Sequence, residues 1–281
     1  MSLEAHYSTA GLLARIEQAI TEAGLRTDAI DVETLASVDE FHIGGREATA
    51  ALVDQLELSE RDYVLDIGCG LGGTARFVAS EYGCKVTGID LTSEFVDTGN
   101  ELCRWVGLEN QISLVQGNAL ALPFEAEQFD SATMIHVGMN IEDKSMLFQQ
   151  IYDVLRPGAQ FAVYDIMSMT KGALAYPLPW ASTPGMSHLS SRIAYKSALK
   201  KAGFEMHAER DRGAFAVDFY KRMKARMDTV DATPALGLHL LMGEETKHKV
   251  GNMIAGIQAG LIAPVEIVVG KSLKVSKSVG R

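Results

Sequence analysis

Cysteine is scarce in this chain, whose 281 residues include three: Cys69, Cys84 and Cys103. An odd number of cysteines without CxxC spacing indicates neither a disulfide framework nor a zinc site. Cys69 lies inside a glycine-rich turn, where we expect it to be a small residue that fits the turn rather than a catalytic thiol. The sequence therefore predicts no metal site.

Long apolar runs and an excess of basic residues are missing as well. No apolar run reaches the about 20 residues that span a bilayer, and the first residues, MSLEAHYS, lack the features of a signal peptide. A formal net charge of −10 argues against broad binding of nucleic acid or anionic membranes, because both need a basic surface. We expect a cytoplasmic protein that binds neither. Its oligomeric state is left open, with a homodimer as one option.

Four glycines, by contrast, lie close together in one turn. An apolar strand is expected over 63–67, and a helix over 74–82 that Gly83 ends. Between them lie Gly68, Gly70, Gly72 and Gly73. A residue without Cβ lets a ligand approach the backbone, and a helix start presents unpaired N–H groups. The turn therefore predicts a site for a nucleotide-like ligand.

A second apolar strand, over 85–89, is followed directly by Asp90. An acid at the carboxyl end of the second strand of a doubly wound sheet bonds a ribose diol. The alternative is that Asp90 only caps the next helix. Both interpretations remain open at this point.

Strands and helices alternate from residue 61 onward. We expect further strands over 112–116, 131–137, 161–165, 204–210 and 265–269, and helices over 93–106, 144–155, 191–202, 214–227 and 244–258. This order predicts an α/β fold, a doubly wound Rossmann-like sheet with helices on both faces. Ligands of such sheets bind beyond the carboxyl ends of the strands.

The flanks of the sheet depart from this alternation. Helices over 10–23 and 48–56 come before the first strand, so we expect residues 1–58 to form a helical N-terminal cap. Residues 59–281 then form the Rossmann-like domain, with lid segments over about 166–190 and 211–262. The stretch FHIGGREAT lies between the two early helices, and Gly44 and Gly45 make it either a simple turn or a loop over the ligand's charged end.

The order VLDIGCGLGG, VTGID, QGNALALPF, FD and VLRPG resembles the class I S-adenosylmethionine-dependent methyltransferases over about residues 60–210. The resemblance implies S-adenosyl-L-methionine as cofactor and a seven-stranded, mostly parallel sheet whose last strand is antiparallel. It also implies that the methionyl part is bordered by Asp66, Gly68, Cys69 and Gly70, the ribose and adenine by Asp90 and Leu91, and the adenine edge by Asn118 and Ala119. We add Gly44, Gly45, Gly72 and His136 to this cofactor-binding set.

The flanking motifs FHIGGREAT, HVGMNIEDK, YPLPWA and LGLHLLMG resemble the branch that contains the sarcosine and dimethylglycine N-methyltransferases. This implies a small-molecule methyl acceptor such as one of these amines. Ile135 stands where that branch often has Gln, and the lid is apolar, which suggests as an alternative an O- or C-methyltransferase of a natural product or quinone. A non-catalytic cofactor-binding module is a third alternative. An NAD-dependent dehydrogenase is disfavoured by the GxGxG spacing.

Two residues near the end of the 131–137 strand are candidates for catalysis. His136 can orient or deprotonate the acceptor, because the ordinary pKa of histidine is near neutrality, although a purely structural histidine fits the pattern equally. Asn140 can bond an acceptor amine or carboxylate. Arg46 or Arg192 can pair with a substrate carboxylate. The aromatic residues expected to close the site are Tyr7, Tyr176 and Trp180.

Overall fold

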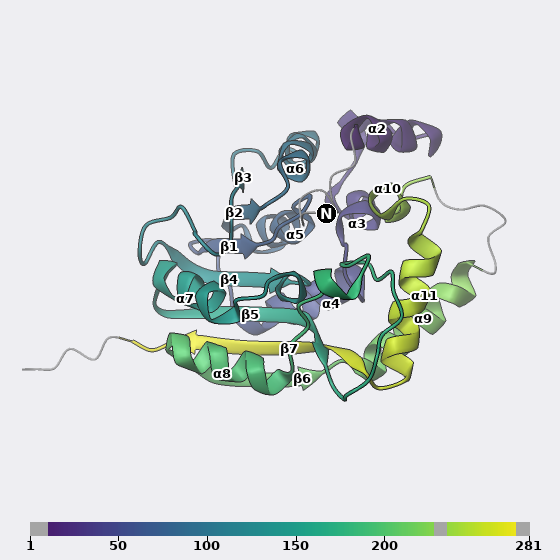
Figure 1. The fold of residues 1–281 in the computed structure, drawn as a ribbon. Helices are drawn as coiled ribbons and strands as arrows, with labels where there is room; N and C mark the ends of the chain where they lie inside the picture. The colour runs from purple at the N-terminus through teal and green to yellow at the C-terminus, as the bar shows by residue number, and fades with distance from the viewer. Residues whose placement is uncertain (1–10, 228–234, 274–281) are drawn as a thin grey trace, which may run out of the picture.

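Seven strands form one sheet in the order β3-β2-β1-β4-β5-β7-β6 (Figure 1). The computed structural model describes residues 11–227 and 235–273. Its strands are β1 Tyr63–Ile67, β2 Lys85–Asp90, β3 Ile112–Gln116, β4 Phe129–Ile135, β5 Leu155–Ser168, β6 Phe204–Asp211 and β7 Ile262–Lys271. Neighbouring strands are parallel except where β7 pairs with β5 and β6. The predicted fold class is confirmed.

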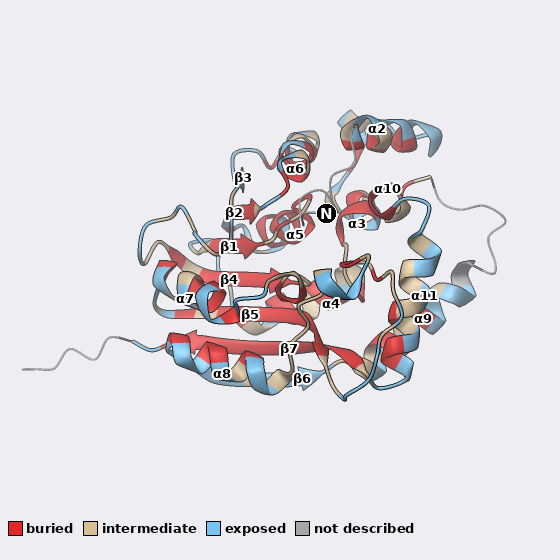
Figure 2. Cartoon of the chain, in the orientation of Figure 1, coloured by how far each residue is buried: buried red, intermediate tan, exposed pale blue. Residues whose placement is uncertain are grey.

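Helices cover both faces of this sheet. One face carries α7 (Lys144–Val154) and α8 (Arg192–Ala202), and the opposite face carries α4 (Gly45–Val53), α5 (Gly73–Tyr82) and α6 (Ser93–Trp105). Figure 2 shows that the central strands between these layers are buried. All ten residues of β7 are buried, and its run of β-branched residues is typical of a strand covered on both faces.

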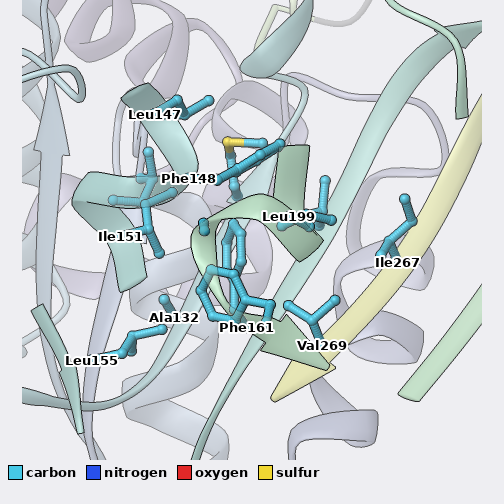
Figure 3. Packing of buried hydrophobic residues seen from close by; sticks show 14 of the residues in the cluster. Ala132, Leu147, Phe148, Ile151, Leu155, Phe161, Leu199, Ile267 and Val269 are labelled. Atoms are coloured by element: carbon cyan, nitrogen blue, oxygen red, sulfur yellow. The ribbon is translucent and has the colours of Figure 1, made fainter. Parts of the chain in front are cut away.

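The largest apolar cluster lies between the sheet and the α7/α8 layer (Figure 3). Leu147, Phe148 and Ile151 project from α7 towards Phe161 of β5, and Leu199 of α8 joins them. These α7 positions recur every three to four residues, so the helix presents one apolar stripe to the sheet. This cluster fixes β4, which is followed by the candidate site residues His136 and Asn140, and β5 beside it.

A helical cover lies beside the carboxyl ends of the parallel strands, on the right in Figure 1. It consists of α2 (Leu12–Glu22), α3 (Val32–Asp39), α9 (Gly213–Met227), α10 (His239–Met242) and α11 (Thr246–Gln258). Leu12 and Ile16 of α2 share an apolar cluster with Leu236 and Leu241 at α10. The early and late segments of the chain therefore meet above the sheet. Within the described residues, no helix has the length and apolar character needed to cross a membrane.

Most expected elements form with small shifts of their bounds. The predicted bounds of β1 and β3 are confirmed, whereas β5 and β7 extend further at both ends than expected. The prediction that β4 reaches residue 137 is wrong, because His136 adopts φ 55° and leaves the extended conformation. Helix α3 was not predicted, although Asp31 marks its start by accepting a hydrogen bond from the Thr34 N–H at 2.8 Å.

A buried ion pair connects α3 to α5. Arg76 Nη2 lies 2.5 Å from Asp39 Oδ2, and both side chains are fully shielded from solvent. Arg76 Nη1 also donates to the Gly99 carbonyl oxygen at 3.2 Å, which ties α6 to the same point. The pair therefore joins the cover to the helix that follows the glycine turn.

We predict that Arg76→Met lowers the free energy of unfolding by about 3–5 kcal/mol, because Asp39 is left buried without its partner. The double variant Asp39→Leu/Arg76→Met should recover most of that loss, since it removes both charges. Urea denaturation monitored by circular dichroism measures the free energy of unfolding of each variant.

Arg156→Met is the matched control. Arg156 Nη1 lies 2.5 Å from Asp130 Oδ1, the same separation, but the arginine side chain is 48% exposed. An exposed pair contributes about 0–1 kcal/mol. Equal losses for Arg76→Met and Arg156→Met would show that burial of the first pair has no energetic consequence.

Candidate functional site

A cavity of about 2630 Å³ lies between the carboxyl ends of the strands and the helical cover. Among the residues predicted to bind cofactor or acceptor, it is lined by Gly45, Asp66, Gly68, Cys69, Gly70, Asp90, Leu91, Asn118, Ala119, His136 and Asn140. Gly44 and Gly72 are absent from this lining, and each instead caps a helix in a left-handed conformation. Tyr7 lies outside the described residues. The structure thus brings residues from five separate segments of the chain to one space.

The glycine turn approaches the cavity with bare backbone. Gly68 and Gly70 have φ values of 66° and 53°, which side-chain-bearing residues rarely adopt. A Cβ on Gly68 would lie 2.3 Å from a Val137 methyl, whereas a Cβ on Gly70 would have no atom within 4 Å. Gly68 is therefore required for packing, and Gly70 keeps open space beside the backbone for a ligand.

Asp90 links the turn to the next strand connection. Its Oδ2 accepts a hydrogen bond from Gly70 N–H and its Oδ1 from Thr92 N–H, both at 2.9 Å. Thr92 is the N-cap of α6, so the capping interpretation of Asp90 holds in part. Burial raises the pKa of Asp90, while the two backbone hydrogen bonds lower it. The carboxylate is fixed in position at the edge of the cavity.

Asp66, at the same end of the cavity, has one oxygen without a partner. Thr133 donates a hydrogen bond to Asp66 Oδ1 at 2.8 Å, and no described residue bonds Oδ2. Burial raises the pKa of Asp66 from its ordinary value of 3.8 to about 7, and the neighbouring Glu40 and Asp90 add to the rise. A cation bound here would favour the ionised carboxylate.

Glu40 is a lining residue that the sequence analysis missed. Arg46 Nη1 lies 2.9 Å from Glu40 Oε1, and Thr49 donates a hydrogen bond to Glu40 Oε2 at 2.6 Å. Arg46 also approaches Glu33, at 3.5 Å. Arg46 is thus paired inside the protein rather than presented to the cavity. The motif FHIGGREAT begins one residue after Glu40. Glu40 therefore lies just outside the motif, which is why the motif did not point to it.

Asn118 and Cys69 offer few polar groups that can bond a ligand. Asn118 Oδ1 accepts a hydrogen bond from Leu120 N–H at 2.9 Å, which fixes the loop after β3. Burial raises the pKa of the Cys69 thiol, and the nearby Asp90 and Asp66 add to the rise. The thiol therefore stays protonated and unreactive. Among the described residues, no group of three or more His, Cys, Asp or Glu is placed to hold a metal ion.

His136 occupies a strained position at the boundary of the polar end. Its φ of 55° is unusual for a residue with a side chain, and its N–H donates to the Tyr164 carbonyl oxygen at 2.7 Å. The ring lies 5.2 Å from that of Tyr164 and 5.8 Å from that of His42. Burial, together with His42, holds the pKa of His136 well below 6.5. The lowered pKa makes the imidazole a weak base, which disfavours its predicted role as the group that takes up a proton.

The other end of the cavity is mostly apolar, although Lys221, Lys224 and Lys247 also belong to its lining. Its wall comes from the lid and from α9, α10 and α11, through Trp180, Phe219, Tyr220, Met223, Leu238, Leu241, Met242, Val250, Met253 and Ile254. Trp180 Nε1 donates to Ser187 Oγ at 3.0 Å, so its polar atom is satisfied within the lid. Tyr176 packs against this cluster without lining the cavity. Arg192 also lies away from the cavity, 3.7 Å from both Glu209 and Asp211.

Comparison with known proteins identifies the domain around the glycine turn. Residues 65–163 match the family model described as a methyltransferase domain. A sterol 24-C-methyltransferase of Debaryomyces hansenii is 30% identical over 178 residues, which cover 59% of this chain and 47% of the relative. The chain spans about half the length of the curated relatives it matches first. The match lies within the predicted methyltransferase domain, and the predicted cofactor, S-adenosyl-L-methionine, is confirmed.

Two solved structures show the same fold. A geranyl diphosphate C-methyltransferase from Streptomyces coelicolor A3(2) has a TM-score of 0.65 at 18% identity, covering 94% of this chain and 99% of that one. A proposed sarcosine dimethylglycine methyltransferase from Galdieria sulphuraria has a TM-score of 0.64 at 21% identity, covering 82% and 86%. The resemblance to the sarcosine and dimethylglycine branch in particular is not confirmed.

The residues present suit this cofactor. S-Adenosyl-L-methionine carries positive charge on its sulfonium and amino groups, and the buried Asp66 has an unpartnered oxygen at the polar end of the cavity. The missing Cβ at Gly70 leaves space beside the turn. The paired Asp90 carboxylate is fixed where a ribose is expected in such sheets.

We predict that Gly70→Val abolishes measurable binding of S-adenosylhomocysteine, because the new side chain fills the space that a Cβ finds open. Isothermal titration calorimetry of the purified variant measures the affinity. Gly107→Val is the matched control, since Gly107 has φ 71° and also has no atom within 4 Å of a built Cβ, but lies outside the cavity lining. Both valines are strained by about 1–2 kcal/mol. Near-native affinity of Gly70→Val for S-adenosylhomocysteine would contradict the assignment of the space beside Gly70 to the ligand.

A second prediction concerns Asp66. Because its pKa in the folded protein is about 7, above that of the unfolded chain, its contribution to stability falls as the pH rises towards 7. Asp66→Asn should therefore raise the free energy of unfolding at about pH 8, by about 1 kcal/mol or more, with a gain that shrinks as the pH falls. The same variant should bind S-adenosyl-L-methionine more weakly. Urea denaturation across this pH range and calorimetry test both; a pH-independent difference in stability would rule out the buried carboxylate as its source.

Proposed function

We propose that the protein is an S-adenosyl-L-methionine-dependent methyltransferase that methylates a carbon or oxygen atom of a small, largely apolar molecule. The observation that carries this proposal is one cavity of about 2630 Å³ with carboxylates at the glycine turn and an apolar wall beneath α9, α10 and α11. Small-ligand sites commonly measure about 300–1,000 Å³. The cavity therefore has room for a methyl donor and a second molecule beside it.

The residues at the two ends of the cavity support separate places for the methyl donor and the acceptor. When bound, the cofactor supplies a methyl group on a positively charged sulfur. Asp66 and Asp90 would hold the cationic and ribose parts, and Gly70 would let them approach the backbone. The lid and the helical cover would exclude water, and the apolar wall would hold the acceptor in line. Positioning of this kind can supply effective concentrations of about 10⁵–10⁸ M.

The chemical class of the methyl acceptor follows from the apolar wall of the cavity. The sterol 24-C-methyltransferase and the geranyl diphosphate C-methyltransferase are named for acceptors with a large hydrocarbon part. An amine such as sarcosine, the other candidate acceptor, carries a carboxylate that needs a cationic partner. Arg46 is already paired with Glu40 and Glu33, and Arg192 lies away from the cavity. Lys221, Lys224 and Lys247 also line the cavity and could pair with a carboxylate, so the preference for an apolar acceptor rests on the apolar wall and not on a lack of cations.

His136 and Asn140 lie where the two ends meet, and we assign them an orienting role. A neutral imidazole can hydrogen-bond the acceptor without taking up its proton. His136 Nε2 has no partner among the described residues, which agrees with a partner arriving on the ligand. The proton that the acceptor loses after methyl transfer would then pass to bulk water when the products leave the cavity, rather than remain on His136.

The experiment that tests the function is transfer of label from S-adenosyl-L-methionine tritiated on its methyl group into a cell extract. The extract is separated into an organic-solvent fraction and an aqueous fraction before and after incubation with the protein. We expect the label in the organic fraction. Label confined to aqueous amino acids would support N-methylation instead, and no transfer despite tight S-adenosylhomocysteine binding would indicate a non-catalytic module.

Two variants accompany this assay. Gly70→Val should transfer no label, which links transfer to the cofactor site. His136→Ala should reduce turnover at least about tenfold, a loss of about 1.4 kcal/mol or more in transition-state stabilisation, while S-adenosylhomocysteine affinity changes little. Unchanged turnover of His136→Ala at saturating acceptor would remove His136 from the acceptor site.

A further inference from the structure

Tyr220 is a buried tyrosine whose hydroxyl has no hydrogen-bond partner among the described residues. It lies on α9, lines the cavity and is 9% exposed. In the core, the Tyr195 hydroxyl donates to Asp165 at 2.7 Å, whereas the Tyr164 hydroxyl has no partner and is shut off from solvent. The Tyr220 hydroxyl differs from both, because it has no partner in the described part of the chain and is not among the fully buried polar atoms, so a molecule in the cavity can reach it.

The side chains packed around the Tyr220 ring are apolar, so they offer its hydroxyl no hydrogen-bond partner. The ring packs in one apolar cluster with Trp180 of the lid and Met253 of α11. Burial raises the pKa of Tyr220, so the hydroxyl keeps its proton and can donate. The Tyr164 hydroxyl also lacks a partner, but Tyr164 does not line the cavity and cannot meet a ligand there.

The position of Tyr220 relates it to the reaction. Its cluster includes Ile43 and Met139, which are the sequence neighbours of His42 and Asn140. Ile43, Met139 and Tyr220 all line the cavity. The ring therefore stands close to the boundary between the cofactor end and the apolar end. A hydrogen bond formed there would fix how far an apolar molecule enters and which of its atoms faces the methyl donor.

We propose that the Tyr220 hydroxyl donates a hydrogen bond to a hydroxyl or carbonyl oxygen of the acceptor, and so determines specificity for an apolar molecule that carries one such oxygen. This rests on the proposed function, because it concerns the acceptor end of the same cavity. A site that supplies a buried hydrogen bond discriminates strongly against analogues that lack the matching group, because its own polar atom is then left unpaired. Tyr220 is a specificity-determining residue in this proposal and takes no part in the bond changes.

The test compares two probes of equal size, 1-decanol and n-undecane, which differ in whether a hydroxyl or a methyl group ends the chain. Each displaces the fluorescent apolar dye N-phenyl-1-naphthylamine from protein saturated with S-adenosylhomocysteine. Tyr220→Phe should weaken 1-decanol binding about 2- to 12-fold, the range of one hydrogen bond, and leave n-undecane binding unchanged. Comparing the two probes within each variant removes their difference in water solubility.

Tyr152→Phe is the matched control. Tyr152 lies on α7 beside Lys271 and outside the cavity lining, so its hydroxyl should affect neither probe. Equal binding of 1-decanol to wild type and Tyr220→Phe would overturn the proposal, as would an equal loss for both probes. Failure of both probes to displace the dye from wild type would also overturn it, together with the apolar acceptor. Calorimetry with S-adenosylhomocysteine tests the cofactor end separately, so the two failures can be told apart.

Discussion

The buried pair of Arg76 and Asp39 is the interaction on which the geometry of the site depends. It holds the end of α3 against the start of α5, directly behind the glycine turn. A Cβ on Gly73 would lie 2.7 Å from the Asp39 carbonyl oxygen, so this glycine permits the close approach that the pair requires. Two charges without solvent need each other, because either one alone would be strongly unfavourable. The helical cover and the cofactor turn are therefore parts of one structural unit.

The sheet could be predicted from the sequence because its signals are local. The apolar run of β1, the glycine turn and Asp90 lie within 28 residues of the chain, from Tyr63 to Asp90. Strand pairing then follows from the alternation of strands and helices. The same locality explains why Asp66, Gly68, Gly70 and Asp90 were correctly expected to meet. The extension of β5 through Pro157 was not predicted, because proline and glycine are typical of turns and the strand was expected only from residue 161.

The parts that escaped prediction depend on contacts across the chain. Glu40 reaches the cavity only because Arg46 and Thr49 of α4 hold it there. Arg46 was a reasonable candidate for a substrate carboxylate until the structure showed both of its acidic partners. The left-handed backbone of His136 likewise has no signature in the sequence, since only a few per cent of residues other than glycine adopt that region. Burial and pairing decide these roles, and no single stretch encodes them.

The division of the cavity into two ends also bears on how a methyl group can be transferred. Carboxylates at one end attract positive charge, and their raised pKa values reflect the free energy that burial without a ligand costs. A bound cation would offset that cost, whereas a product that has lost the sulfonium charge would offset less of it. The apolar end holds its ligand mainly by burial of apolar surface, together with the hydrogen bond proposed for Tyr220, and neither depends on the charge of the cofactor. Methyl transfer across the boundary would therefore weaken the hold on the spent cofactor while leaving that on the acceptor nearly unchanged, which favours release of the cofactor product from the polar end.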